Sequence, residues 1–199
     1  LIVLSNGDFA VIGYTYSNDG DLPGHHGGVD GAADGFIARF DKDGNTLWTK
    51  QYGGTYFVSA GSDFFYSCIE KENGNLIAVG STTSQNGDLV PDWISNNPSF
   101  KVGWFVEVDG VDGSIITSKR VKSANHSELN ENTIEDIVAL SDGTGYYTVG
   151  LQGYFLNGVH WVTKLDTDGE KVWDAEVGNI NGLFVYQTSI NQAYDGNIM

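Results

Sequence analysis

Carboxylate-rich segments are the part of this sequence best suited to chemistry. Asp19, Asp21 and Asp30 stand in one glycine-rich stretch, and Asp88 stands in a similar stretch further along the chain. Oxygen ligands on flexible loops suit a hard cation such as Ca²⁺. The sequence therefore predicts that these four residues are the best candidates for a metal site, with calcium as the cofactor to test.

Aromatic residues in the same kind of segment point to a second site. Trp93 lies beside Asp92 in a long connection, and Tyr16 and Tyr154 lie where strands should give way to loops. Aromatic rings stack on sugar rings or peptide side chains, and loops often carry binding residues. We expect Trp93, Tyr16, Asp92 and Tyr154 to contribute to ligand binding. The alternative is that Trp93 packs only against its own loop.

Residues for catalysis show no recognisable spacing. The sequence contains no Gly-x-Ser-x-Gly turn, no His-Glu-x-x-His motif and no phosphate-binding glycine loop. Adjacent side chains point opposite ways on an extended chain, so His25 and His26 favour loop packing over a shared zinc site. Carboxylate pairs for glycoside hydrolysis depend on spatial separation, which a sequence leaves open. We expect no catalytic activity.

Charge and composition restrict the partners. The 199 residues include 10 Lys and Arg against 26 Asp and Glu, a formal net charge of −16. Nucleic acids and anionic membranes attract the opposite charge. Apolar residues make up 40% of the chain, enough for a packed core, and no apolar run reaches the roughly 18 residues of a membrane span. The expected partner is a glycan or protein, with no nucleic acid and no membrane insertion.

The elements that position these residues form a repeat. An apolar run, a turn with Gly and a second apolar run closed by Gly occur at 2–13, 69–80 and 138–150, and a fourth copy starts at Ile190. In the first three copies, an aromatic-led strand, an Asp-Gly turn and another strand follow. Asn-Gly and Asp-Gly pairs between alternating segments indicate β-hairpins. Each repeat thus predicts four antiparallel strands.

Repeated four-stranded units are typical of the blades of a β-propeller. The sequence therefore predicts an all-β fold, with residues 1–199 forming a single β-propeller segment of about three blades plus part of a fourth. Closed propellers have about 4–8 blades, so we expect a segment of a longer propeller whose remaining blades complete the ring. The alternative is a homodimer, closed by exchange of a strand at 184–190.

Some residues favour structural interpretations. Residues 41–45 and 166–170 begin like calcium loops but lack the later ligands, so we interpret them as hairpin turns. Cys68, the one cysteine, lies in an apolar stretch and is expected to be buried and unreactive.

The glycine-rich stretch at 18–28 has a distinctive order of residues. It contains Gly-Asp and Gly-His-His-Gly-Gly, and it precedes a strand, an Asp-x-x-Gly turn and Trp48. This order resembles the extracellular β-propeller repeats of large secreted or cell-wall-attached bacterial proteins. The second repeat keeps only Asn86-Gly87-Asp88 of the glycine-rich part, and the third keeps only the strand, the turn and Trp173. The resemblance implies a secreted or cell-surface location and transfers no catalytic residue.

The turn at 166–173 also resembles the Trp-docking turn of quinoprotein propellers, which implies packing of Trp between blades.

Taken together, the sequence predicts a non-catalytic binding or adhesion module that recognises a glycan or protein through its loops. Two alternatives remain at this point: part of a glycan-degrading or quinone-dependent propeller enzyme, and a structural spacer in a large surface protein.

Overall fold

Strands provide the regular structure of the computed structural model, which describes residues 1–22, 24–26, 32–56, 59–89, 101–124, 131–153, 157–181 and 189–191. The strands are β1 (Ile2–Val3), β2 (Phe9–Thr15), β3 (Asp34–Phe40), β4 (Thr46–Tyr52), β5 (Thr55–Tyr56), β6 (Ser59–Ala60), β7 (Asp63–Glu70), β8 (Leu76–Thr82), β9 (Val102–Val108), β10 (Ile115–Val121), β11 (Glu131–Asn132), β12 (Asp136–Ala139), β13 (Tyr146–Gly153), β14 (Asn157–Leu165) and β15 (Lys171–Asn181). Within these residues, no helix is long and apolar enough to cross a membrane.

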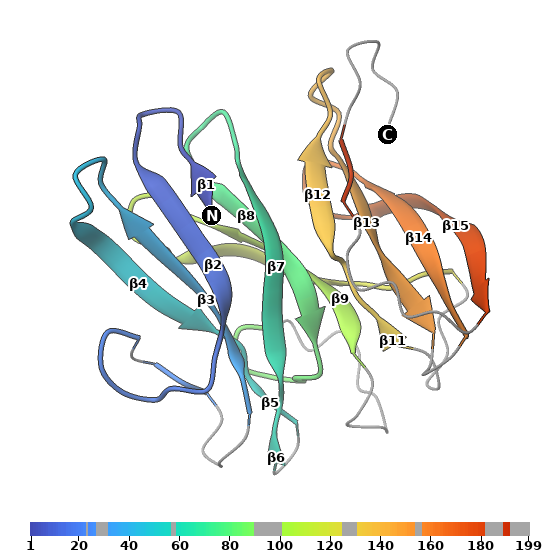
Figure 1. Cartoon of the computed structure of the whole chain (residues 1–199), viewed down its shortest axis with the longest axis horizontal. Helices are drawn as coiled ribbons and strands as arrows, with labels where there is room; N and C mark the ends of the chain where they lie inside the picture. Colours follow the sequence, from blue (N-terminus) through green and yellow to red (C-terminus); the bar gives the residue numbers. More distant parts are fainter. Residues whose placement is uncertain are drawn as a thin grey trace.

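Three antiparallel sheets follow one another along the chain (Figure 1). Sheet 1 has the order β1-β2-β3-β4, and sheet 2 has the order β7-β8-β9-β10. In sheet 3, β11 and β12 both pair with β13, which is followed by β14 and β15. The short hairpin β5-β6 connects the first two sheets. The predicted all-β class and the four-stranded antiparallel units are thus confirmed, and the described sheets do not close into a ring.

Turn chemistry explains why the strands end where they do. Gly44, in the turn between β3 and β4, has a φ of 87°, a conformation that side-chain-bearing residues rarely adopt. Asp41 Oδ1 accepts hydrogen bonds from the backbone amides of Asp43 at 2.9 Å and Asn45 at 2.8 Å. Asp166 holds its own turn in the same way. These carboxylates serve the backbone, which confirms the hairpin interpretation of both turns.

The first core lies between sheets 1 and 2. Alternate residues of β8 and β9 face sheet 1, and Trp104 among them is fully buried. Phe65 of β7 stacks on Trp104 with ring centroids 4.8 Å apart. Cys68 belongs to the same core, and burial raises the pKa of its thiol to about 12, which agrees with an unreactive cysteine.

The second core lies between sheets 2 and 3. The other alternating residues of β8 and β9, including Ile77 and Phe105, pack against Trp161 and Leu165 of β14. Sheet 2 is therefore covered on both faces, as the uniform burial of β8 and β9 shows. This layering explains why the central strands β8 and β9 are buried along their whole length, whereas buried and more exposed residues alternate in strands of the outer sheets.

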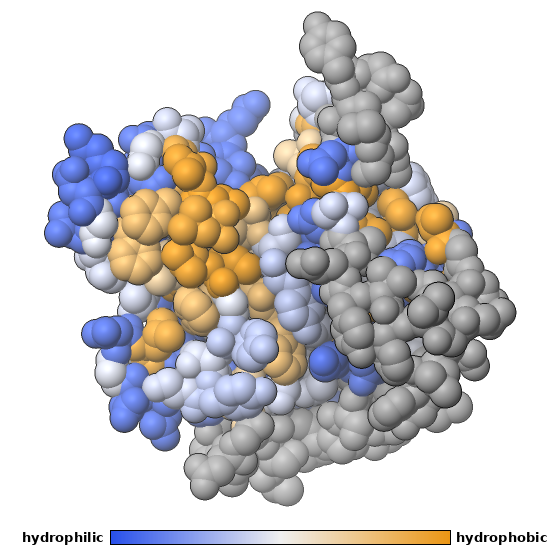
Figure 2. Space-filling view, in the orientation of Figure 1, coloured by the Kyte–Doolittle hydropathy of each residue, from blue (hydrophilic) through white to orange (hydrophobic). Residues whose placement is uncertain are grey.

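Apolar side chains also gather on the side of sheet 1 that points away from sheet 2. Figure 2 shows hydrophobic residues grouped over β1 and β2. Val3 is 73% exposed there, and Phe9 stacks on Phe40 with ring centroids 5.1 Å apart. The strand expected at 184–190 lies outside the described residues except for its last two positions, Ser189 and Ile190.

Candidate functional site

The predicted ligand-binding residues fall into two groups. Tyr16 lies just after β2 with 60% of its surface exposed, whereas Trp93, Asp92 and Tyr154 lie outside the described residues. The ligand role of those three residues therefore stays a prediction. In the structure, the ring of Tyr16 contacts the ring of Tyr14 edge-on, with ring centroids 6.1 Å apart.

Tyr16 is the first member of an aromatic row that crosses from sheet 1 to sheet 2. Tyr14, 49% exposed at the end of β2, contacts Phe64 of β7 with ring centroids 4.9 Å apart. Phe64 in turn lies parallel to Tyr66, with centroids 6.2 Å apart. Tyr16, Tyr14, Phe64 and Tyr66, hereafter the aromatic row, bring together two chain segments that are about fifty residues apart in sequence.

Strand geometry explains the row. Residues two apart on a strand share a face, so Tyr14 lies on the same side of β2 as Ile12, which packs against the first core. Phe64 lies on the side of β7 opposite its neighbour Phe65, which stacks on Trp104. A register irregularity in the pairing of β7 with β8 falls between Phe65 and Ser67. A bulge of this kind changes the direction of a side chain, and here it leaves both Phe65 and Tyr66 with packing partners.

Polar groups flank the aromatic row. Lys101 Nζ lies 4.7 Å from the centre of the Phe64 ring, a cation–π contact. The Tyr66 hydroxyl lies 3.2 Å from Ser81 Oγ, and burial, aided by the charges of Glu135 and Glu131, raises the pKa of Tyr66 to about 12. Its phenol is therefore neutral at physiological pH and can donate or accept a hydrogen bond.

A second cluster lies where loops of sheets 1 and 2 meet. Asp34, at the start of β3, is fully buried. Its Oδ2 accepts a hydrogen bond from the His26 backbone amide at 2.6 Å and lies 2.9 Å from His26 Nδ1. His26 Nε2 lies 3.4 Å from Asp88 Oδ2. The hydrogen bond with Asp34 raises the pKa of His26, and burial raises that of Asp88.

Asp63, at the start of β7, is the other buried acid of this cluster. Its carboxylate accepts hydrogen bonds from Ser84 Oγ at 2.6 Å, from Thr82 Oγ1 and from the Gly54 amide at 3.0 Å. Burial raises the pKa of Asp63 to about 7, despite these donors and with a further contribution from Asp34. The Asp63 carboxyl group therefore gains or loses its proton near neutral pH.

Gly53 allows these acids to approach one another. A Cβ atom at position 53 would lie 2.5 Å from Asp63 Oδ2 and 2.7 Å from Asp34 Oδ1. Asp34 Oδ1 is buried and accepts no hydrogen bond from the described part of the chain. His26, bound to Asp34 and close to Asp88, offsets part of this buried negative charge when its ring is protonated.

The predicted calcium ligands do not form one described cluster. Asp19 Oδ1 accepts a hydrogen bond from Ser17 Oγ at 3.0 Å, while Asp88 belongs to the His26 cluster. Among the described residues, no group of three or more His, Cys, Asp and Glu side chains is arranged to hold a metal ion. Asp30 lies outside those residues, so the calcium site stays a prediction.

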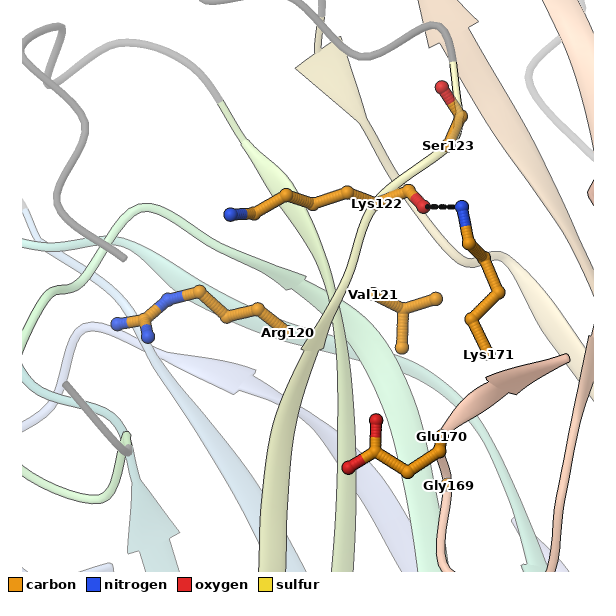
Figure 3. Close-up of a pocket in the computed structure, with 7 residues that line it drawn as sticks. All are labelled: Arg120, Val121, Lys122, Ser123, Gly169, Glu170 and Lys171. Atoms are coloured by element: carbon orange, nitrogen blue, oxygen red, sulfur yellow. Dashed lines mark hydrogen bonds between the residues drawn. The ribbon is translucent and has the colours of Figure 1, made fainter. Parts of the chain in front are cut away.

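A pocket of about 240 Å³ lies between β10 of sheet 2 and the start of β15 in sheet 3 (Figure 3). Lys171 Nζ donates a hydrogen bond to the Lys122 carbonyl at 2.8 Å, and Lys119 pairs with Glu170 at 2.7 Å. The charged ends of Arg120 and Lys122 point to one side, away from Lys171. The cations around this pocket therefore do not converge on one anion.

The comparisons with known proteins give no family. No protein-family model matches the chain, and the search of curated proteins found no match. The geometry of the site is therefore the basis for its function.

Sequence reasoning missed Phe64 and Tyr66 of the aromatic row and Asp63 of the second cluster. Phe64 and Tyr66 have the alternation of an ordinary strand, and no local signal separates them from core residues. Asp34 and Asp63 do carry a signal, since each is an acid at the first position of an apolar strand. Charged residues are seldom fully buried without a partner. An acid at the first position of an apolar strand therefore indicates that another polar residue, here His26, lies beside it.

Proposed function

We propose that this chain is a binding module that holds an uncharged glycan on the aromatic row, without catalysis. The observation that carries the proposal is the exposed pair Tyr14 and Tyr16, continued by Phe64 and Tyr66 on the next sheet. Rigid rings in a row offer stacking platforms for the apolar faces of successive sugars.

Charge supports an uncharged ligand. A net charge of −16 repels uronic or sulfated chains. The Tyr66 hydroxyl and the carboxylates of Glu131 and Glu135, which act on that phenol, are suited to hydrogen bonds with sugar hydroxyls. Asp34 and Asp63 are fully covered, which favours binding over acid–base chemistry by this pair.

The same proposal includes the fold and the location. The three consecutive antiparallel sheets and the repeat that encodes them support blades of a β-propeller. The resemblance to bacterial extracellular repeats supports a secreted or cell-surface protein. A module of this kind would serve adhesion or capture of polysaccharide.

A glycan array followed by titration calorimetry tests the function. We expect a neutral oligosaccharide to bind, and we expect Tyr14→Ala and Tyr16→Ala each to weaken binding about tenfold, since each removes one stacking platform. Tyr16→Phe keeps the ring and should keep most of the affinity. Leu47→Ala, at a residue 51% exposed on β4, is the matched control. Equal affinity of Tyr14→Ala and the unchanged protein would refute the assignment.

A further inference from the structure

The contacts between sheets 1 and 2 show which residues hold one sheet against the next. Ala10, Arg39 and Trp48 are aligned across β2, β3 and β4. Trp48 Nε1 donates a hydrogen bond to the Gly110 carbonyl at 3.1 Å, and the Arg39 guanidinium donates to the same oxygen. A cation and an indole N–H from sheet 1 thus hold the turn between β9 and β10 of sheet 2.

Sheet 3 carries the same row on the side that points away from sheet 2. Tyr147, Lys164 and Trp173 are aligned across β13, β14 and β15. The rings of Tyr147 and Trp173 lie 5.7 Å apart, and Trp173 is 39% exposed. We call this row the Trp173 face. It repeats the cation and indole that sheet 1 uses against its neighbour.

Sheet 1 presents the surface that such a face would meet. Val3, Phe9 and Phe40 are aligned across its first three strands. We call this row and the turn at 41–45 the Phe40 face. The residues at the positions of Phe9 and Phe40 are buried in the other two sheets: Leu76 and Val108 in sheet 2, and Tyr146 and Leu165 in sheet 3.

The turn glycines show the same difference. A Cβ at Gly113 of sheet 2 would lie 2.8 Å from Trp48, and one at Gly169 of sheet 3 would lie 2.6 Å from Phe105. In both turns an aromatic ring of the preceding sheet covers the glycine. A Cβ at Gly44 of sheet 1 would meet nothing within 4 Å. Among the residues that the structure describes, the Phe40 face is therefore the uncovered member of a series of like surfaces.

We propose that a second copy of this chain covers the Phe40 face with its Trp173 face, head to tail. Lys164 would then approach the turn that carries Asp41 and Asp43, which gives the contact complementary charge. The packing would reproduce the contact that this chain makes between its own sheets 1 and 2. This inference is independent of glycan binding.

The proposed contact joins two different surfaces, so it is heterologous. Two copies contribute six sheets, a number within the range of closed propellers. The ring then contains two equal contacts, and a contact that does not close would instead produce longer chains of copies. The charge of −16 on each copy opposes association at low ionic strength, so the test uses about 0.15 M salt.

Sedimentation velocity over a range of concentrations tests the proposal. The unchanged chain should form dimers, and Trp173→Ala and Val3→Asp should each raise the dissociation constant about tenfold or more. Both residues are exposed, so each variant should keep its strands, which circular dichroism checks. Val111→Asp is the control, because Val111 is 84% exposed on the turn of sheet 2.

Mixing the two variants distinguishes the head-to-tail contact from a symmetric one. Trp173→Ala keeps an intact Phe40 face, and Val3→Asp keeps an intact Trp173 face, so a mixed pair has one contact with neither substitution and one contact with both. The second substitution removes little from a contact that the first has already disrupted, so the mixture should associate more tightly than either variant alone. An unchanged chain that stays monomeric at every concentration would overturn the proposal. So would a mixture with no gain, or a loss of association in Val111→Asp.

Discussion

Because Asp63 is buried, we expect the free energy of unfolding to decrease between pH 6 and pH 8. The pKa of Asp63 is raised from 3.8 in the unfolded chain to about 7 in the folded protein. The folded state therefore binds the proton more tightly. The contribution of Asp63 to stability is fully present below pH 3.8, falls as the pH rises above that value, and is lost as the pH passes through 7. His26 acts in the same direction, because its pKa is raised above 6.5.

The size of the effect follows from the linkage relation. One proton bound more tightly by the folded state across one to two pH units corresponds to about 1–2 kcal/mol of unfolding free energy. For a chain of this length, each kcal/mol shifts the melting temperature by about 2–4 °C. The melting temperature should therefore be roughly 2–8 °C lower at pH 8 than at pH 6, as measured by circular dichroism.

Two variants separate Asp63 from other groups. Asp63→Asn keeps the size of the side chain but cannot ionise, so it should lose the part of the pH dependence due to Asp63. Asp112→Asn, at a turn residue whose pKa is lowered by its hydrogen bonds to Ser114, should keep the full dependence. Equal melting temperatures at pH 6 and pH 8 in the unchanged protein would refute the reasoning, as would an unchanged difference in Asp63→Asn.

Two further substitutions test the packing between sheets 1 and 2. Phe65→Ala removes a buried ring stacked on Trp104 and should cost about 3–5 kcal/mol in a denaturant titration; a loss under about 1 kcal/mol would contradict the packing. Gly113→Ala and Gly44→Ala both place a side chain at positive φ, but only the first meets Trp48. Gly113→Ala should therefore cost about 1–3 kcal/mol more than Gly44→Ala, and equal costs would show that Trp48 does not cover this turn.

Local chemistry made the strands and turns predictable. The strand expected at 36–41 is β3 (Asp34–Phe40), and the one expected at 104–109 is β9 (Val102–Val108). Alternation and Asn-Gly or Asp-Gly turns act over a few residues, so they can be detected without knowledge of the rest of the chain. The hairpin interpretation of 41–45 rested on the same local signals and is confirmed.

The binding surface was predicted only in part, because it depends on contacts between residues that are far apart in sequence. Tyr16 was identified from its place at a strand end, and the structure shows it exposed. Phe64 contacts Tyr14, the ring neighbour of Tyr16, only because sheet 1 packs on sheet 2. Asp88 was predicted as one of four candidate calcium ligands on separate loops. In the structure it lies beside His26, a neighbour that only the folding of the chain brings close.

The class of the fold, its repeat and its acidic charge were predictable from the amino-acid sequence alone, because they depend on neighbouring residues and on composition. Which repeats contribute to one surface became known only from the packing of the sheets. The aromatic row and the buried pair Asp34 and Asp63 each combine residues from different sheets. Their contacts depend on register and on the way one sheet covers another, and these arise from packing of the whole chain rather than from any short segment.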